Sequence, residues 1–206
     1  MIKLYGFTVS NYFNMVKMAL LEKNIEFEMV EAKPSQDEAF LAISPMGKVP
    51  ALQTEEGLIT ETDVIFDYLE EACGGVSLMP ESPFERAKVR ELIKEIELYI
   101  ELPARSCFAE AFFGGSVSDE VKEKAQANLE KGMACLKRNG KFSPYVAGDT
   151  FTYADIMFMY SVNLAGSCAR RVFKTDLLAD FPEAKKLVDL IATRESAIKI
   201  AADSKA

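Results

Sequence analysis

The sequence contains no histidine. Histidine is the usual general base at neutral pH and a common zinc ligand, so any catalysis has to rely on hydroxyls, backbone amides or carboxylates. The four cysteines are widely spaced and form no Cys-x-x-Cys pair. We therefore expect no metal site, and we expect the cysteines to be reduced structural residues. They are Cys73, Cys107, Cys135 and Cys168.

Positive charge and long apolar runs are also scarce. The chain has 24 Lys and Arg residues against 32 Asp and Glu residues, a net charge of −8, so we expect no nucleic-acid partner. No window reaches the roughly 18 uncharged apolar residues that a membrane-spanning helix needs. The opening residues, MIKLYGF, lack the basic start and the apolar run of a secretory signal. A soluble, cytoplasmic protein without a membrane partner is the expectation.

The first half of the chain mixes strand and helix patterns. Residues 2–5 and 25–31 alternate apolar and polar side chains, which is typical of strands, and Ile25, Phe27 and Met29 fall on one face. The apolar residues between these two runs recur at helical spacing, so the unit is a strand, a helix and a parallel strand.

The rest of this half predicts a hairpin between two helices. "VPALQT" and "GLIT" are typical of two short strands, and a short connecting helix is expected around residues 36–42. "TDVIFDYLEEACGG" is typical of a helix that ends at its glycines. The sequence therefore predicts an α/β domain over residues 1–76.

The strand pattern disappears after a stretch rich in Gly, Ser and Pro. We expect a linker over residues 77–86 and an all-α domain over residues 87–206. Residues 85–113 carry apolar side chains at spacings of three and four, and residues 118–140 form a second charged amphipathic pattern. Residues 153–169 are apolar nearly all round, which predicts a central buried helix. Thr152 and Asp155 have the spacing of a capping box at its start, which we assign to folding.

Ser10 lies where the first strand turns into the first helix. In a unit of this kind such turns gather at the carboxyl edge of the sheet, where ligands bind. Ser10 is either a helix cap or, with the amides and dipole of the helix behind it, a hydrogen-bond donor to an anion such as a thiolate. Without a histidine beside it, we do not expect it to be a nucleophile.

Two further motifs are candidates for ligand binding. In "SPMGKVPAL", a cis Val49–Pro50 bond would leave the backbone N–H and C=O of Val49 to pair with a passing peptide, whereas a trans proline would simply mark a strand edge. In "TETDVIF", Glu61 and Thr62 stand at a helix start. They are either a solvated charge and an N-cap, or the groups that hold an ammonium and a carboxylate.

In their order and spacing these motifs resemble those of the cytosolic glutathione transferases, in particular the serine-type, bacterial-like members. "SPMGKVPAL" resembles the family's Asn-Pro-x-Gly-x-Val-Pro-x-Leu, "ETDVI" its Glu-Ser-x-x-Ile, and "GDTFTYADI" the capping box of its helical domain. The resemblance covers almost the whole chain. It implies a thioredoxin-like N-terminal domain, an all-α C-terminal helical bundle domain, a homodimer, and glutathione as co-substrate.

The resemblance also implies how glutathione is bound. Val49 would pair through its backbone with the cysteinyl unit, beside the cis proline, and Glu61 and Thr62 would bind the γ-glutamyl end. Lys48 would reach a carboxylate of the ligand. Many members place a histidine or another base at the glycyl carboxylate, and here Lys33 is the nearest cation.

Ser10 matches the catalytic hydroxyl of the serine-type members, which holds the glutathione sulfur as a thiolate. Tyr5 and Tyr12 are rival hydroxyls, because some classes of the family use a tyrosine. A cysteine is absent from this position, which excludes a mixed-disulfide mechanism through it.

The resemblance implies a second substrate, a small hydrophobic electrophile, bound between the domains. Phe7, Phe108, Phe112 and Phe113 are candidates to line its pocket, although their spacing fits core or dimer contacts equally well. We expect an enzyme that conjugates glutathione to this electrophile. The alternatives are a glutathione-dependent peroxidase or disulfide reductase, and a non-catalytic binding or regulatory protein of the same fold.

Overall fold

The computed structural model describes residues 1–204, and the chain divides into two compact units. The first unit contains Met1–Met79 together with the segment that begins at Thr193, and the second is Pro80–Ala192. The sequence placed the linker over residues 77–86, where the first unit gives way to the second. It assigned the whole C-terminal segment to the helical domain, whereas the structure groups the last helix with the first unit.

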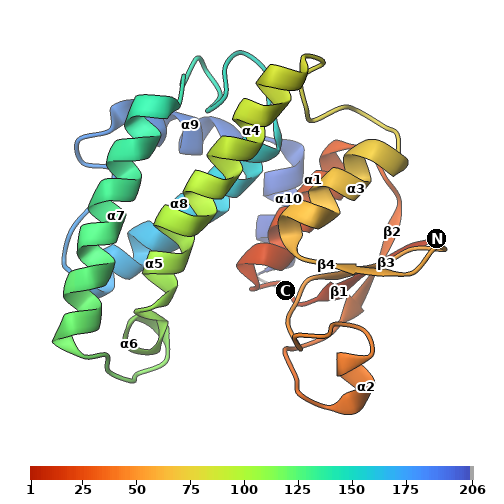
Figure 1. The fold of residues 1–206 in the computed structure, drawn as a ribbon, viewed down its shortest axis with the longest axis horizontal. Coiled ribbons are helices and arrows are strands. Elements are labelled where there is room, and N and C mark those ends of the chain that lie inside the picture. The colour runs from red at the N-terminus through yellow and green to blue at the C-terminus, as the bar shows by residue number, and fades with distance from the viewer. Residues whose placement is uncertain (205–206) are drawn as a thin grey trace. The chain divides into compact units, whose positions relative to one another are not determined.

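The first unit is built on a four-stranded mixed sheet. Its elements are β1 (Ile2–Gly6), α1 (Asn11–Glu22), β2 (Phe27–Glu31), α2 (Glu38–Leu41), β3 (Ala51–Gln53), β4 (Leu58–Thr60), α3 (Thr62–Ala72) and α10 (Glu195–Asp203). The strand order is β2–β1–β3–β4, with β1 parallel to β2 and both remaining pairs antiparallel. Helices α1 and α3 pack against each other over the sheet (Figure 1). This is the thioredoxin-like arrangement that the sequence predicted.

The core of the first unit lies between α1 and the sheet. Leu4 on β1 and Leu52 on β3 face each other in register and are fully buried. The predicted apolar face of the second strand is only partly confirmed, because β2 begins at Phe27 and Met29 is 42% exposed. β2 has a neighbour on one side only, so its side chains are less covered than those of the central strands.

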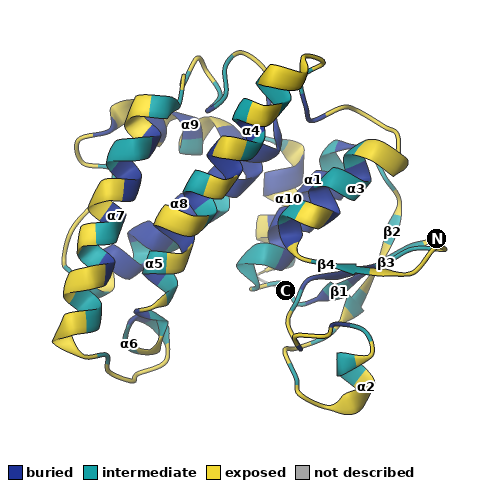
Figure 2. Cartoon of the chain, in the orientation of Figure 1, coloured by how far each residue is buried: buried dark blue, intermediate teal, exposed yellow. Residues whose placement is uncertain are grey.

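The second unit is entirely helical. Its elements are α4 (Pro83–Ile96), the π-helix η1 (Glu97–Glu101), α5 (Leu102–Arg105), α6 (Phe108–Phe112), α7 (Asp119–Asn139), α8 (Tyr153–Val172) and α9 (Pro182–Ala192). Helix α8 contacts α4, α5, α6 and α9, and most of its residues are buried (Figure 2). The predicted capping box is present at Thr152 and Asp155. Within residues 1–204, no helix is long and apolar enough to cross a membrane.

The helical pattern over residues 85–113 is broken by a π-helix. Pro103 has no N–H, so it cannot donate to the carbonyl of Tyr99, four residues earlier, as an α-helix requires. The backbone widens there, and the N–H of Leu102 donates to the carbonyl of Glu97, five residues back. Helix α7 packs closely against η1 at Gly132. A Cβ at this position would lie 2.1 Å from the carbonyl oxygen of Tyr99, so a larger residue would not fit.

Candidate functional site

The site residues predicted from the sequence lie at one edge of the sheet. β1 is parallel to β2 and, through two antiparallel pairings, to β4, so these three strands end at the same edge and β3 begins there. In the register, Tyr5 pairs with Ala51 and Ala51 with Thr60. The turns at this edge carry Ser10, Lys33, Lys48, Val49, Glu61 and Thr62.

Ser10 is the N-cap of α1. Its N–H donates to the carbonyl of Phe7 (3.0 Å), and its Oγ accepts from the N–H of Phe13 at 3.4 Å. The cap prediction is therefore confirmed. The hydroxyl donates to no atom of residues 1–204, so its proton is free for a ligand. The amides and the dipole of α1 favour negative charge at this position.

The rival hydroxyls occupy different environments. The hydroxyl of Tyr5 donates to Oε1 of Gln53 on β3, at 2.6 Å, so its single proton is engaged within the sheet. Tyr12 is the second residue of α1 and is half-buried. The geometry thus favours Ser10 over Tyr5 as a donor to a ligand, and it leaves Tyr12 as the rival candidate.

The backbone of Val49 is available to a ligand. The Val49–Pro50 bond is cis, with Pro50 buried and Val49 half-buried. In the part of the chain that the structure describes, no hydrogen bond engages the N–H or the C=O of Val49. An extended peptide along this edge therefore finds one donor and one acceptor.

The turn before Val49 is held in a fixed conformation. The Oγ of Ser44, a buried residue, accepts from the N–H of Lys48 at 3.2 Å. Gly47 has a φ of 63°, and a Cβ there would lie 2.1 Å from the oxygen of Ser35, so the position requires glycine.

Two exposed lysines flank this edge. Lys48 follows the turn directly, and Lys33 follows β2, where the N–H of Ala32 donates to the carbonyl of Gly6 at 3.0 Å. Neither ammonium group makes an ion pair with another of residues 1–204. Both charges are thus available to an anion.

Glu61 and Thr62 form an open helix start. Glu61 is exposed, occupies the N-cap position of α3 and has φ 68° and ψ 121°, which is unfavourable for a residue with a side chain. The side chain of Glu61 makes no capping hydrogen bond. Thr62 is the first helical residue and is buried, so the simpler interpretation of Thr62 as N-cap is wrong. Backbone strain at an open helix start is typical of a ligand site.

Sequence reasoning did not single out Asn14 and Lys17. Both lie on α1, four and seven residues after Ser10, and both are buried. Their helical spacing could have indicated them, because residues four and seven positions after Ser10 lie on the same face of α1 as Ser10.

The aromatic candidates on α6 are packed with cations. The rings of Phe108 and Phe112 meet edge to face with centroids 5.1 Å apart. The guanidinium of Arg105 lies 4.8 Å from the first ring and that of Arg171 lies 4.9 Å from the second. Phe113, directly after α6, is exposed. These rings are therefore partly covered by charged groups of the second unit.

The cysteines fit the structural role predicted for them. All four are free thiols, and Cys107 and Cys168 are buried. Burial raises the pKa of the Cys168 thiol to about 11. A thiol in this environment is a poor nucleophile at neutral pH. Among residues 1–204, no group of three or more His, Cys, Asp or Glu side chains is arranged to hold a metal ion.

The fold defines a class of protein, a thioredoxin-like domain followed by an all-α domain. Residues 4–77 match the family model described as "Glutathione S-transferase, N-terminal domain", and residues 106–201 match "Glutathione S-transferase, C-terminal domain". A glutathione S-transferase from Pseudomonas putida is 56% identical over 206 residues, covering 100% of this chain and 94% of that protein. The chain therefore belongs to the glutathione S-transferase family and is an enzyme of this class.

Solved structures agree with this assignment. A glutathione transferase from Populus trichocarpa has a TM-score of 0.84 and 25% sequence identity, covering 100% of this chain and 99% of that one. A glutathione S-transferase from Rhodospirillum rubrum has a TM-score of 0.77 and 28% identity, covering 97% and 91%. The predicted family and fold class are thus confirmed.

Proposed function

We propose that this enzyme joins the sulfur of glutathione to a small hydrophobic electrophile and that Ser10 holds this sulfur as a thiolate. The observation that carries the proposal is the hydroxyl of Ser10, which accepts from Phe13 and whose proton has no acceptor among residues 1–204. Lowering a thiol pKa from about 8.5 by about two units requires about 2.7 kcal/mol. One hydrogen bond to the anion and the start of α1 supply an amount of this order.

In the proposed reaction the thiol of glutathione releases its proton to solvent, and the hydroxyl of Ser10 donates to the sulfur anion that remains. The sulfur forms a bond with a carbon of the electrophile, and the leaving group departs with the electron pair of its broken bond. The chain has no histidine to act as a base. A lowered thiol pKa makes such a base unnecessary at neutral pH.

The cysteinyl unit and the γ-glutamyl end of glutathione would be held just before β3 and at the start of α3. The N–H and C=O of Val49, next to Pro50, would pair with the cysteinyl unit. The carboxylate of Glu61 would hold the ammonium of the γ-glutamyl end, and the start of α3 at Thr62 would hold its carboxylate.

The exposed lysines would complete the site. Lys48 is placed beside Val49 and would attract a carboxylate of the ligand, and Lys33 would attract the glycyl carboxylate. Both are exposed and flexible point charges, so each is expected to contribute little.

We also propose that the enzyme works as a homodimer in the cytoplasm. Membership of the glutathione S-transferase family supports this. Sedimentation equilibrium tests the oligomeric state, and a mass twice that of the chain is the expected result.

The experiment that tests the function is the kinetics of Ser10→Ala with glutathione and an aromatic halide. We expect kcat/KM to fall about tenfold or more while glutathione affinity changes little. Ser116→Ala is the matched control, because Ser116 is exposed and makes no hydrogen bond with the described residues. Unchanged turnover in Ser10→Ala would remove Ser10 from the mechanism and point to Tyr12. Wild-type activity on hydroperoxides but not on halides would replace conjugation by reduction.

A further inference from the structure

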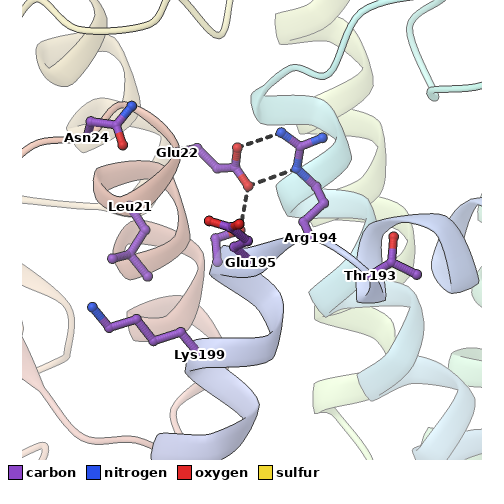
Figure 3. A pocket seen from close by; sticks show the side chains of 8 residues that line it. Leu21, Glu22, Asn24, Thr193, Arg194, Glu195 and Lys199 are labelled. Atoms are coloured by element: carbon purple, nitrogen blue, oxygen red, sulfur yellow. Dashed lines mark hydrogen bonds and ion pairs between the residues drawn. The ribbon is translucent and has the colours of Figure 1, made fainter.

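The last helix of the chain is tied to α1 at both ends. At the start of α10, Arg194 donates to both carboxylate oxygens of Glu22, at 2.8 and 2.6 Å, and the hydroxyl of Ser196 donates to the same carboxylate (Figure 3). These residues border an open hollow of about 540 Å³. At the other end of α10, the ammonium of Lys17 lies 2.6 Å from Oδ2 of Asp203.

The second ion pair is the less usual one, because Lys17 is buried. Its side chain is 2% exposed, and Asp203 is its single partner among residues 1–204. A buried ammonium without a partner is strongly unfavourable, so Lys17 draws the end of α10 onto α1. The carboxylate of Asp203 remains 40% exposed.

This tie lies on the face of α1 that begins at Ser10. A spacing of seven residues returns to the same face of a helix after two turns, about 10 Å along its axis. Asn14 lies on the same face between them, is 7% exposed, and donates from Nδ2 to the carbonyl of Thr8 at 2.8 Å.

The carbonyl of Thr8 has a second donor, and this donor comes from the far end of the chain. The hydroxyl of Ser204, directly after α10, lies 2.9 Å from the oxygen of Thr8 and 3.0 Å from the oxygen of Ile200, so its proton is shared between them. Val9, the residue between Thr8 and Ser10, is 72% exposed, so packing does not fix this turn. Hydrogen bonds from α1 and from the end of α10 fix it instead.

We propose that the C-terminal end of α10 positions Ser10 for catalysis. Asp203, through Lys17, docks this end of α10 on α1, and Ser204 then holds the turn that presents the Ser10 hydroxyl. Asp203, Lys17 and Ser204 are positioning residues, because none of them touches the reacting sulfur. The inference rests on the proposed function, in which Ser10 donates to the glutathione thiolate.

The ion pair allows an effect of position to be separated from an effect of charge. Lys17→Met removes the cation and leaves Asp203 in contact with water, whereas Asp203→Asn leaves the cation without its partner. Through charge alone, the first change raises the pKa of a thiol bound at Ser10 and the second lowers it. Through position, both changes raise this pKa, because both release the turn.

The experiment measures the pKa of the glutathione thiol in the enzyme complex, by ultraviolet absorbance of the thiolate during a pH titration. We expect Lys17→Met and Asp203→Asn each to raise this pKa by roughly half a unit, about threefold in the ratio of thiolate to thiol. Ser204→Ala is expected to act in the same direction by a smaller amount. Asp203→Glu keeps the carboxylate and is expected to restore most of the wild-type value.

Kinetics provide a second readout. Below the thiol pKa, kcat/KM of Lys17→Met with an aromatic halide is expected to fall about threefold, in proportion to the thiolate fraction. Well above that pKa the loss disappears, because all bound glutathione is thiolate in both proteins. A merely structural loss would instead lower activity equally at every pH.

The matched control is Glu22→Gln. It removes the ion pair at the other end of α10, about 18 Å along α1 from Ser10, and so loosens the same helix without reaching the turn. We expect reduced thermal stability and an unchanged thiol pKa. Equal pKa shifts in Glu22→Gln and Lys17→Met would overturn the proposal.

Three outcomes separate this inference from the proposed function. If Ser10→Ala raises the thiol pKa while Lys17→Met and Ser204→Ala leave it unchanged, the positioning role is overturned and the role of Ser10 stands. If Lys17→Met and Asp203→Asn shift the pKa in opposite directions, the pair acts through charge and positioning is overturned. If Ser10→Ala itself leaves the pKa unchanged, both proposals fail.

Discussion

Helix α8 has an acidic residue in its first turn and α3 has one at its N-cap, and the two helix starts are built in opposite ways. At the start of α8, Asp155 is fully buried and accepts from the N–H groups of Thr152 and Val146, both at 2.8 Å. At the start of α3, Glu61 is exposed, has a φ of 68°, and its side chain makes no capping hydrogen bond. Every helix start leaves amide groups without partners. In α8 the side chain of Asp155 provides a partner and so closes the start, whereas in α3 the side chain of Glu61 does not.

The far end of α3 repeats the closed arrangement. Glu70 accepts from the hydroxyl of Ser77 and the N–H of Leu78 and pairs with the ammonium of Lys23 at 3.1 Å. Lys23 also donates to the carbonyl of Val76. One helix thus carries a carboxylate fully used by the fold at one end and a carboxylate without a partner among residues 1–204 at the other. Their surroundings, rather than their residue type, separate the two.

The largest effect is expected at the closed start. Asp155→Ala leaves the backbone N–H groups of Thr152 and Val146 without an acceptor, which costs about 3 kcal/mol or more. Urea denaturation measures the loss, and Asp189→Asn on the exposed face of α9 is the control, expected to change little. If Asp155→Ala lost no more stability than the control, the box would not be the element that fixes α8.

A pH effect is expected at the far end of α3. Burial alone would raise the pKa of Glu70, but the bonds from Ser77 and Leu78 and the charge of Lys23 outweigh it, so this pKa lies below its ordinary value. A carboxyl whose pKa is lower in the folded state stabilises the fold above its unfolded pKa, about 4.3. That stabilisation is lost as the pH falls through the folded-state pKa.

Thermal unfolding from pH 7 down into the acid range measures this contribution. Glu70→Gln is expected to lower Tm at neutral pH and to flatten its decrease in acid, because the group that titrates is gone. Glu26→Gln removes an exposed carboxylate that no residue of the described chain engages, and it should follow the wild-type curve. Parallel curves for wild type and Glu70→Gln would contradict the assignment.

Local signals predicted much of this fold. The helix starts at Ser10 and at Thr152, the hairpin and the glycine end of α3 are all encoded within a few residues, and all are present. The π-helix could have been anticipated from Pro103 but was not, because the apolar spacing around it continues without interruption. Local patterns did not decide between a cis and a trans Val49–Pro50 bond. The cis bond was implied by the order of several motifs, through their resemblance to the glutathione transferases, and it is present.

The pairing of Lys17 with Asp203 lay beyond any local signal. The two residues are 186 positions apart, and a lysine among apolar residues of an amphipathic helix is ordinarily read as solvent-exposed. The same holds for the helix that ends at Asp203, because no local pattern indicates its contacts with α1. The position of such a helix depends on contacts between segments that are far apart in the sequence. A local sequence pattern does not show which segments these are.

The smallest effect on stability is expected for substitutions of Glu61 at the start of α3. Glu61→Gly and Glu61→Ala both remove the carboxylate, so both should weaken glutathione binding, by about tenfold if that group holds an ammonium. Only glycine relieves the unfavourable φ, so Glu61→Gly should be more stable than Glu61→Ala by about 1 kcal/mol. Calorimetric titration measures the first effect and urea denaturation the second.

The two variants therefore test whether the backbone conformation of Glu61 at the start of α3 serves the stability of the fold or the binding of glutathione. If Glu61→Gly is more stable than Glu61→Ala but binds glutathione more weakly than the wild type, the strained conformation serves to place the carboxylate for binding. Equal stability of the two variants would mean that the backbone is held there by its surroundings at no cost. Unchanged glutathione affinity in both would mean that Glu61 is a solvated charge, and the contrast with Asp155 would then be one of burial alone.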